Sequence, residues 1–576
     1  MKKTFSRWMV LIFTSLLVTA LTGCGSPDEK KQAFLDKGSA LFEKEDYVKA
    51  KLEFKNALQI DQNFAQAYYM LGKTELELKN FKKAYGSLSK AVELDPSNIE
   101  ARVILGKLLL AGRAPDKAGE QADAILAIDK DHLQGNLLKA SVHFAQKEYK
   151  DGEAILVSLH QAGQSSPEMF AMLSSVARLN QDKARMRDYL KQGLAKNPGH
   201  VPLLLGMAQL EADEKNFGAV EQNLLKVIEQ KPDEILHKLN LAKLYLSQDQ
   251  KDKAENLLNT ALAEKENDDK TRLSIAALWV ASNEIQKAED LIKKGIESFP
   301  ESFDFYLFLA DLYAKTKRIN EAETILTKAL EINPDPANPG IIKSKTALAK
   351  VLLAQAKIKQ GEKLVDEIIE NDPKNVDAHF LKGRLFLSRK DGVNAVPEFR
   401  LVTEDRPQMV QAHLNLAQAH ALNKEFELAM DVLEKAHSKM PKADVLLKAM
   451  ARLNIANKDL DRAETNLMAA VEANPDNLQS HIDLGDFYLA QKKYDKALSQ
   501  YTLVKEKKPD NARGWLKAAA VYSQQKQIKK ALAELEKGYK KNPDSALILA
   551  ALADQYIKNK DLDAAFKLCQ DRLDKN

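Results

Sequence analysis

Cysteine, tryptophan, glycine and proline are all rare in this sequence. Its 576 residues include 2 cysteines, 3 tryptophans, 23 glycines and 18 prolines. Cys24 and Cys569 lie at opposite ends of the chain, so they cannot form a disulfide framework or, by themselves, a four-ligand zinc site. Few glycines and prolines, together with abundant Ala, Leu, Lys and Glu, favour helix along most of the chain. We therefore expect an all-α protein that is stabilised by packing.

An excess of charge of one sign is also missing. The formal net charge is +4, and three of the basic residues (Lys2, Lys3 and Arg7) lie in the first 23 residues. Nucleic-acid-binding proteins normally have a basic domain or stripe, so we expect no nucleic-acid partner. A single hydrophobic core stops growing near about 250–300 residues, so a chain of this length consists of several domains or of a repeat array.

Residues 1–23 have the pattern of a secretory signal peptide: a basic start, an apolar run over 8–20 and small residues at the end. The run is short for a membrane span, which needs about 20 residues. Leu-Thr-Gly-Cys at 21–24 resembles the lipobox of bacterial lipoproteins, which implies cleavage before Cys24, its lipidation and a tether over 24–30. Gly25 stands where Asp commonly retains lipoproteins in the inner membrane, so the resemblance implies an outer-membrane anchor facing the periplasm in a Gram-negative source. The alternatives are an uncleaved anchor and a secreted chain.

Prolines recur every 34 residues through much of the remaining sequence, for example Pro373, Pro407, Pro441, Pro475 and Pro509. With the proline at position 32, sixteen units begin at residues 31, 65, 99, 133, 167, 201, 235, 269, 303, 342, 376, 410, 444, 478, 512 and 546. Position 8 is Gly, Ala or Ser in every unit, and position 20 is Ala or Gly in fourteen units. Two helices can approach closely where such side chains are small.

Positions 4, 7, 8 and 11 share one helical face, and a second apolar helix follows before the proline. Each unit is therefore predicted to be a helix, a turn and a second helix. Six polar residues stand where the next helix starts and are predicted to cap it: Asn98, Ser302, Asn375, Asn477, Asn511 and Ser545. The pattern resembles the tetratricopeptide repeat (TPR) family over residues 31–576. The resemblance implies a right-handed α-solenoid of about sixteen units, in which neighbours stack because none can bury its apolar face alone.

The repeat spacing grows by five residues after Pro334, in a segment that also contains Pro336 and Pro339. We predict nine units over 31–336, a proline-rich loop or hinge at 337–341, and seven units over 342–576. A longer surface loop and a hinge between the two arrays are both compatible with the sequence.

Several conspicuous side chains are predicted to be structural. Cys569 falls on the apolar face of the last helix, where we expect a small buried residue. Three histidines at position 4 are expected to be partly buried and hydrogen-bonded to neighbours: His379, His413 and His481. The aromatic residues at position 11 are expected to be core: Tyr245, Trp279, Tyr313, Tyr488, Tyr522 and Tyr556. No phosphate-loop, hydrolase, zinc-protease or dinucleotide motif is present, so we expect no catalytic residues, metal or cofactor.

The TPR resemblance implies that positions 2, 5, 9 and 12 of the first helix line a concave groove. Position 5 is apolar or aromatic in fourteen units and position 9 is polar in fourteen. Such a groove suits a peptide with apolar anchors and acidic groups. The candidate groove residues are Tyr69, Lys73, Lys107, Lys243, Asp311, Lys350, Phe380, Arg384, Arg452, Asp486 and Asp554. A mixed charged lining that only keeps the solenoid in solution is the alternative.

These features predict a noncatalytic cell-envelope scaffold that binds proteins or peptides. The segment 47–58 (YVKAKLEFKNAL), following a lipoprotein signal, resembles the TPR lipoprotein of exosortase (PEP-CTERM) systems, which accompany exopolysaccharide production and export. The alternatives are a polysaccharide-secretion or outer-membrane assembly scaffold and, from another class, a glycan-handling or enzymatic subunit. The sequence does not identify the partner or the oligomeric state.

Overall fold

The computed structural model describes residues 26–266 and 268–573, and over these residues it consists of helices α2–α33 without strands. The predicted signal peptide, Cys24 and the start of the predicted tether lie outside the described residues. Contacts divide the chain into two compact units, with the boundary between Thr271 and Arg272, inside α16. The predicted all-α class is confirmed.

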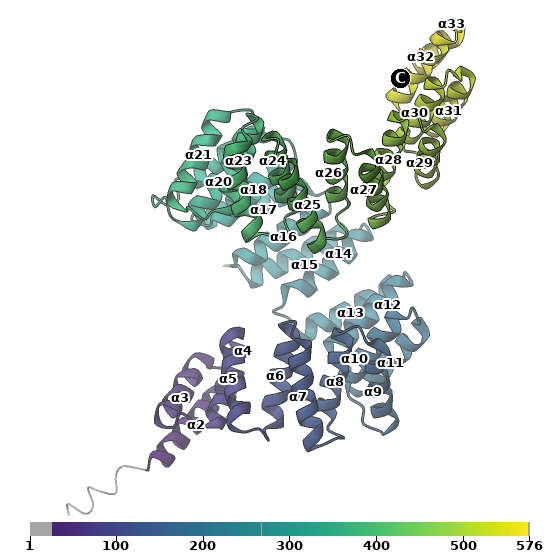
Figure 1. Ribbon diagram of the computed structural model, residues 1–576. Helices are drawn as coiled ribbons and strands as arrows, with labels where there is room; N and C mark the ends of the chain where they lie inside the picture. Colours follow the sequence, from purple (N-terminus) through teal and green to yellow (C-terminus); the bar gives the residue numbers. More distant parts are fainter. Residues whose placement is uncertain (1–25, 267, 574–576) are drawn as a thin grey trace, which may run out of the picture. The chain divides into compact units, whose positions relative to one another are not determined.

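Helices α2–α16 belong wholly or partly to the first unit (Figure 1). Their bounds are α2 (Pro27–Glu43), α3 (Tyr47–Ile60), α4 (Ala65–Glu77), α5 (Phe81–Leu94), α6 (Ile99–Ala111), α7 (Pro115–Ile128), α8 (Leu133–Ala145), α9 (Tyr149–Gln161), α10 (Pro167–Leu179), α11 (Lys183–Lys196), α12 (Val201–Asp213), α13 (Phe217–Gln230), α14 (Ile235–Ser247), α15 (Lys251–Glu264) and α16 (Asp269–Ala281).

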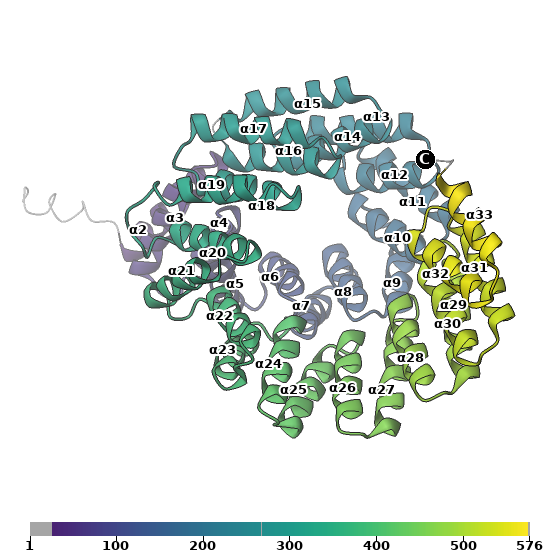
Figure 2. The same ribbon diagram turned by 90° about the horizontal axis from the view of Figure 1, so that it is seen from above.

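The second unit continues with the same alternation. Its remaining helices are α17 (Ile285–Ser298), α18 (Phe303–Lys315), α19 (Ile319–Ala329), α20 (Pro339–Ala354), α21 (Ile358–Asn371), α22 (Val376–Ser388), α23 (Gly392–Asp405), α24 (Val410–Leu422), α25 (Phe426–Lys439), α26 (Asp444–Ala456), α27 (Leu460–Ala473), α28 (Leu478–Ala490), α29 (Tyr494–Lys507), α30 (Ala512–Gln524), α31 (Ile528–Lys541), α32 (Ala546–Lys558) and α33 (Leu562–Leu573). In Figure 2, α20, α22, α24 and α26 line the inner side of the curve of this unit, and α21, α23, α25 and α27 line its outer side.

The even-numbered helices start the sixteen predicted units, and fourteen of them begin at the predicted residue. The two exceptions correct predicted boundaries. Residues 27–30 of the predicted tether form the first turn of α2, which Ser26 and Glu29 close as a reciprocal capping box. Residues 339–341 of the predicted loop form the first turn of α20, because Pro339 suits the first helical position and Asn338 caps the helix. The hinge role of the remaining loop stays a prediction.

Small residues at positions 8 and 20 lie where the two helices of a unit meet. Ala50, Ala84, Ala322 and Ala463 at position 20 are all fully buried. A Cβ added to Gly485 at position 8 would lie 2.5 Å from the ring of Tyr501, the residue at position 24 of the same unit. The predicted close approach of the helices is confirmed, and the space left at position 8 admits the large side chain opposite it.

Five of the six predicted caps are confirmed. The side chains of Asn98, Asn375, Asn477, Asn511 and Ser545 accept hydrogen bonds from backbone N–H groups of the helices that follow them. Ser302 precedes α18 without a side-chain cap hydrogen bond, so this prediction is wrong. A capping side chain thus marks the start of many first helices, although six of them have no side-chain cap hydrogen bond: α4, α12, α14, α18, α24 and α26.

A left-handed residue ends the first helix of every unit. Sixteen non-glycine residues of the described chain have a positive φ, between 56° and 67°, and each stands at position 15 of its unit. The following residue donates its backbone N–H back into the helix, as in Gln527 to the carbonyl of Tyr522 at 2.8 Å. This is the Schellman arrangement, in which glycine is the common residue. Most of these positions hold lysine here.

Replacing one such lysine by glycine should stabilise its unit. Lys526 (φ 58°) is exposed and follows the end of α30, so Lys526→Gly removes the strain of a left-handed backbone. Glycine also raises the entropy of the unfolded chain, but the relief of strain is larger, so the free energy of unfolding should rise by about 0.5–1 kcal/mol. The matched control is Lys537→Gly in the interior of α31, where glycine costs about 1 kcal/mol. Thermal unfolding of the two variants should shift in opposite directions, and a parallel loss would contradict the strain at position 15.

Candidate functional site

The groove face, which we define as positions 2, 5, 9 and 12 of the first helices, lines a row of pockets in the second unit. Between α18, α20 and α22, a pocket of about 390 Å³ is lined by Leu307, Asp311, Lys350 and Asp377, among others. Between α20 and α22, Lys350 and Arg384 line a pocket of about 290 Å³. The structure thus brings together Asp311, Lys350 and Arg384 from three successive first helices.

The next pocket lies between α22 and α24 and shares Arg384 with the previous one. It has a volume of about 590 Å³ and is lined by Phe380, Arg384, Leu387, Ser388, Gln411, Asn415 and Gln418. The Phe380 ring packs edge-on against the buried Phe399, with 5.9 Å between the ring centroids. Phe380 therefore forms part of the groove face and also covers the core.

A separate pocket of about 460 Å³ lies between α26, α27 and α28 and contains the candidates Arg452 and Asp486. Asp486 is already engaged, because its two carboxylate oxygens accept hydrogen bonds from the hydroxyl of Tyr501 at 2.6 Å and from Lys517 at 2.7 Å. Burial, reinforced by this hydrogen bond, raises the pKa of Tyr501. Asp486 therefore holds a core tyrosine in place.

The other two acidic candidates also have partners within their own helices. Asp311 forms an ion pair with Lys315 at 2.7 Å, and Asp554 forms one with Lys558 at 2.6 Å. All four residues are exposed, and exposed pairs of this kind contribute little to stability. Asp554, on α32, lies far along the array from the pockets around Arg384.

The first-unit candidates are dispersed over three helices. On α4, the Lys73 ammonium lies 5.0 Å from the ring centroid of Phe42 and 5.5 Å from that of Tyr69. Lys107 on α6 is exposed and donates to Gln134 at 3.1 Å. Lys243 on α14 is exposed as well. Of these four candidates, the structure brings only Tyr69 and Lys73 into contact.

Sequence reasoning missed a buried polar network at position 5 of α26. Lys448 is only 7% exposed and lies 3.1 Å from Asp444 and 3.7 Å from Asp483. Burial opposes ionisation of Asp444, but hydrogen bonds from Ser480 and Lys448 outweigh it and hold the pKa of this carboxyl below its usual value. The sequence signal that could have revealed this network is the lysine itself, because position 5 is apolar or aromatic in fourteen of the sixteen units.

The position-4 histidines are structural, as predicted. His379, His413 and His481 are buried, and each ring nitrogen Nε2 lies 2.9–3.1 Å from the carbonyl oxygen of the proline six residues earlier. Trp515 and Tyr306, also at position 4, donate to the corresponding carbonyls of Pro509 and Pro300 in the preceding units. Position 4 therefore ties the start of each of these units to the end of the preceding one.

Cys569 contradicts its prediction, because its side chain is exposed. In inner units position 24 is covered on both sides, as in the fully buried Tyr501 and Phe399. Within the described residues, no helix packs on the outer face of α33, so position 24 stays open there.

Four of the six aromatic residues at position 11 are core, as predicted, whereas Tyr522 and Tyr556 are only partly buried. Tyr245, Trp279, Tyr313 and Tyr488 are 4–8% exposed. The hydroxyls of the three tyrosines donate to a glutamate at position 21 of the preceding unit, respectively Glu221, Glu289 and Glu464, at 2.7–3.0 Å. These bonds link consecutive units.

Glu289 is the most enclosed of these glutamates, at 2% exposure. It accepts from Arg318 at 2.5 Å, lies 2.7 Å from Lys293 and accepts from Tyr313 at 3.0 Å. The hydrogen bond from Arg318, with those from Lys293 and Tyr313, lowers the pKa of Glu289 from 4.5 to about 2 against the opposing effect of burial. The carboxylate therefore stabilises the fold in its ionised form.

The lowered pKa of Glu289 predicts that the effect of replacing this residue on stability depends on pH. A depressed folded-state pKa stabilises the protein above the unfolded pKa, and that stabilisation disappears as the pH falls from about 4.5 to about 2. Glu289→Gln should thus lower the free energy of unfolding at pH 7 by up to about 3 kcal/mol, and with it the thermal midpoint. The difference in midpoint from the wild type should shrink towards pH 2. Glu297→Gln, at an exposed position on the same helix, should leave the thermal midpoint unchanged at both pH 7 and pH 2. A gap that is constant with pH would refute the ionised role.

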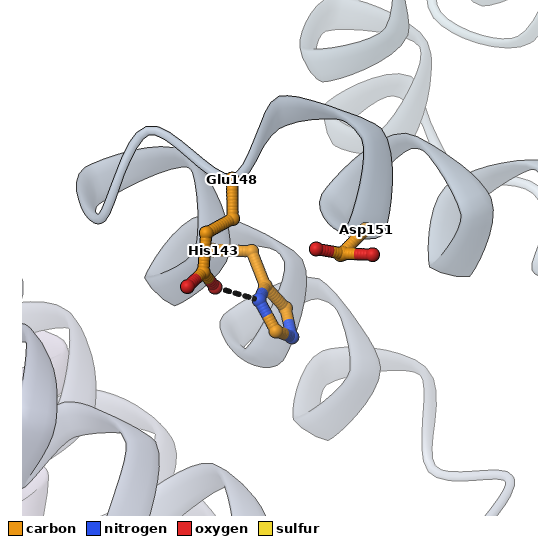
Figure 3. A group of neighbouring side chains, drawn as sticks. All are labelled: His143, Glu148 and Asp151. Carbon is orange, nitrogen blue, oxygen red and sulfur yellow. Dashed lines mark hydrogen bonds and ion pairs between the residues drawn. The ribbon is translucent and has the colours of Figure 1, made fainter.

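One group of side chains has the composition of a metal site (Figure 3). Ligand atoms of His143, Glu148 and Asp151 lie within 4.8 Å of one another, and His143 Nδ1 is 2.7 Å from Glu148 Oε2. The same pairing joins His420 to Glu425 at 2.7 Å, at the same repeat positions 11 and 16. Because this pair closes the turn between the two helices of a unit, the turn itself explains it, and Asp151 is an exposed neighbour.

Comparison with known proteins agrees with this repeat geometry. Sequence profiles described as tetratricopeptide repeat match residues 65–98, 280–345, 346–408, 394–442, 454–520 and 512–554. The chain is an α-solenoid of TPR units. No curated protein matches this TPR chain. Among the residues described, no helix is both long and apolar enough to cross a bilayer.

Solved structures similar to this TPR chain include three complexes or proteins of 14–15% identity. They are Naa15/Naa10 bound to HypK-THB (14% identity, 94% of each chain covered, TM-score 0.47), the APC/C hetero-tetramer Cut9-Hcn1 (14%, 93% of this chain and 98% of that chain, 0.32) and yeast Tom70 (15%, 95% and 97%, 0.37). At these identities and TM-scores the similarities say nothing of a shared partner.

Proposed function

We propose that this TPR protein is a noncatalytic scaffold of the bacterial cell envelope, which binds partner proteins or peptides on its groove face. The observation that carries the proposal is the repeat itself: α2–α33 follow one another as sixteen helix pairs, and the described residues contain no second kind of domain. Repeat solenoids use such extended surfaces for binding. The TPR profiles support the general role as a protein-interaction scaffold.

The envelope location rests on the N-terminal sequence. The basic start, the short apolar run and Leu-Thr-Gly-Cys at 21–24 support lipidation of Cys24 and anchoring in the outer membrane, with the array facing the periplasm. The segment 47–58 supports a link to protein sorting in exosortase (PEP-CTERM) systems and to exopolysaccharide export. A scaffold for polysaccharide secretion or outer-membrane assembly is the competing function. A glycan-handling or enzymatic subunit has less support, because Tyr69 and Phe380 are the only aromatic residues among the groove candidates.

Crosslinked affinity capture from detergent-solubilised envelopes tests the scaffold. The wild-type protein should recover sorting or polysaccharide-export components, and the variant Lys350→Glu/Arg384→Glu/Arg452→Glu should lose them. The control Arg400→Glu/Lys439→Glu/Lys537→Glu makes the same change in charge on second helices, at exposed positions outside the groove face. Equal recovery by both variants would refute the groove, and recovery of no partner by the wild type would refute the scaffold.

The anchor is tested in the same cells with the two cysteines of the chain. Cys24→Ser should release the protein from the membrane fraction and abolish the lipidated N-terminal peptide in mass spectra. Cys569→Ser, at the exposed C-terminal position, should remain membrane-bound. Retention of Cys24→Ser in the outer-membrane fraction would contradict the lipoprotein assignment.

A further inference from the structure

Two adjoining pockets on the groove face of α20, α22 and α24 share the side chains of Arg384 and Ser388. The first pocket has an aliphatic wall of Leu353, Ile358, Leu381 and Leu385, and its polar rim is Lys350, Arg384 and Ser388. In the second pocket the polar groups are mainly the amides of Gln411, Asn415 and Gln418. One charged group therefore stands between an aliphatic pocket and an amide-lined one.

The charge of this surface is not balanced locally. Neither pocket has a carboxylate in its lining. Arg384 is exposed and makes no hydrogen bond or ion pair with any residue that the structure describes. The Lys350 ammonium lies 4.0 Å from the carboxylate of Asp377, which is already bound by Arg406 through two contacts of 3.1 and 3.2 Å. The hydrogen bond from Arg406 also lowers the pKa of Asp377, so this carboxyl stays ionised and occupied.

The other two pockets described above differ in this respect. Asp311 and Asp377 line the pocket between α18 and α20. Asp483 and Asp486 line the pocket of Arg452, beside the buried Lys448. An acidic ligand would meet carboxylates in both of these pockets, whereas around Arg384 it would meet only cations and amides. Among these four pockets, only the two around Arg384 combine cations with a lining that has no carboxylate.

The walls of the two pockets add a requirement for shape. Leu381 and Leu385 are 3% and 4% exposed, so they form a fixed floor, while Ile358 at the edge is 40% exposed. The Asn415 side chain is 6% exposed, and its oxygen accepts from Gln411 at 2.8 Å, which fixes both amides. Amide side chains can donate to and accept from the backbone of an extended chain at the same time.

We propose that this surface, centred on Arg384, binds an extended peptide segment in which an acidic residue adjoins an aliphatic one. The carboxylate binds Arg384 and Lys350, the aliphatic side chain enters the pocket floored by Leu381 and Leu385, and the peptide backbone lies along Gln411 and Asn415. The inference rests on the proposed function. It specifies which kind of peptide the scaffold binds and which three helices, α20, α22 and α24, bind it.

The test uses the full-length protein and defined probes. The fluorescein-labelled peptide Gly-Ser-Glu-Leu-Glu-Leu-Ser-Gly is compared by fluorescence anisotropy with one peptide that has Gln in place of both Glu and another that has Ser in place of both Leu. The Glu-Leu probe should bind at least about tenfold more tightly than either, and its binding should weaken with added salt. Failure to bind up to millimolar concentration, or equal binding of the Gln probe, overturns the proposal.

Variants place the binding on this surface. Arg384→Gln should weaken the Glu-Leu probe at least about tenfold, because a charge-assisted hydrogen bond is lost. Arg400→Gln is the matched control: it lies in the same repeat unit, is exposed and belongs to the second helix, α23. Ile358→Asn should weaken the Glu-Leu probe and leave the Ser probe unchanged, with the exposed Val393→Asn as its control. Because all four side chains are exposed, thermal unfolding should confirm that every variant is folded. Equal effects of Arg384→Gln and Arg400→Gln overturn the assignment.

The outcome is separable from that of the scaffold experiment. If the wild type captures envelope partners but the probe does not bind, the Arg384 surface is wrong and the scaffold stands. If the probe binds as expected and no partner is captured, the scaffold is wrong and the peptide site stands.

Discussion

The close approach of two helices at positions 8 and 20 is the constraint on which the rest of this structure depends. Fully buried alanines such as Ala322 and Ala463 let the helix axes come together, and the large residue at position 24 fills the space that position 8 leaves. Gly485 faces Tyr501 and Gly383 faces Phe399, while alanine at position 8 occurs with smaller partners such as Leu326 and Val365. Interiors pack to near-crystalline density, so the space beside a glycine at position 8 must be filled: the ring at position 24 fills it in these two units, and Leu138 of the following unit fills it beside Gly106.

The groove face is only partly uncovered after these pairs have stacked: position 9 is exposed in Lys107, Lys350 and Arg384, whereas position 5 is buried in Leu137 and Ile482. Its polar residues fall into two groups. Some serve the solenoid itself, as Asp486 does for Tyr501 and as Lys448 does in its buried network with Asp444. Others, Arg384 above all, contribute nothing visible to the fold. A charged residue without a structural partner, beside a firm aliphatic floor, is the kind of group that a ligand can use.

Links between units show how stability and binding can coexist in such an array. The tyrosine at position 11 reaches the glutamate of the unit before it, and the ring at position 4 reaches the carbonyl of the preceding proline. Both contacts lie away from positions 2, 5, 9 and 12. Exposed groove-face residues such as Arg384 can therefore vary without weakening these links, whereas Asp486 and Lys448 take part in the packing themselves.

The sequence by itself determined the helical class, the period of 34, the starting residues of fourteen units and most of the caps, because these depend on local periodicity and on side-chain size. Helical spacing also showed that positions 2, 5, 9 and 12 share a face, and the TPR resemblance predicted that this face lines the groove. It did not reveal the left-handed residue at position 15, because lysine rather than glycine stands there. Only the tertiary structure decided that Asp311, Asp486 and Asp554 are already paired, that Cys569 is exposed and that Arg384 has no partner among the described residues. These outcomes depend on which side chains the stacking of neighbouring helices brings within reach, and a single helix does not contain that information.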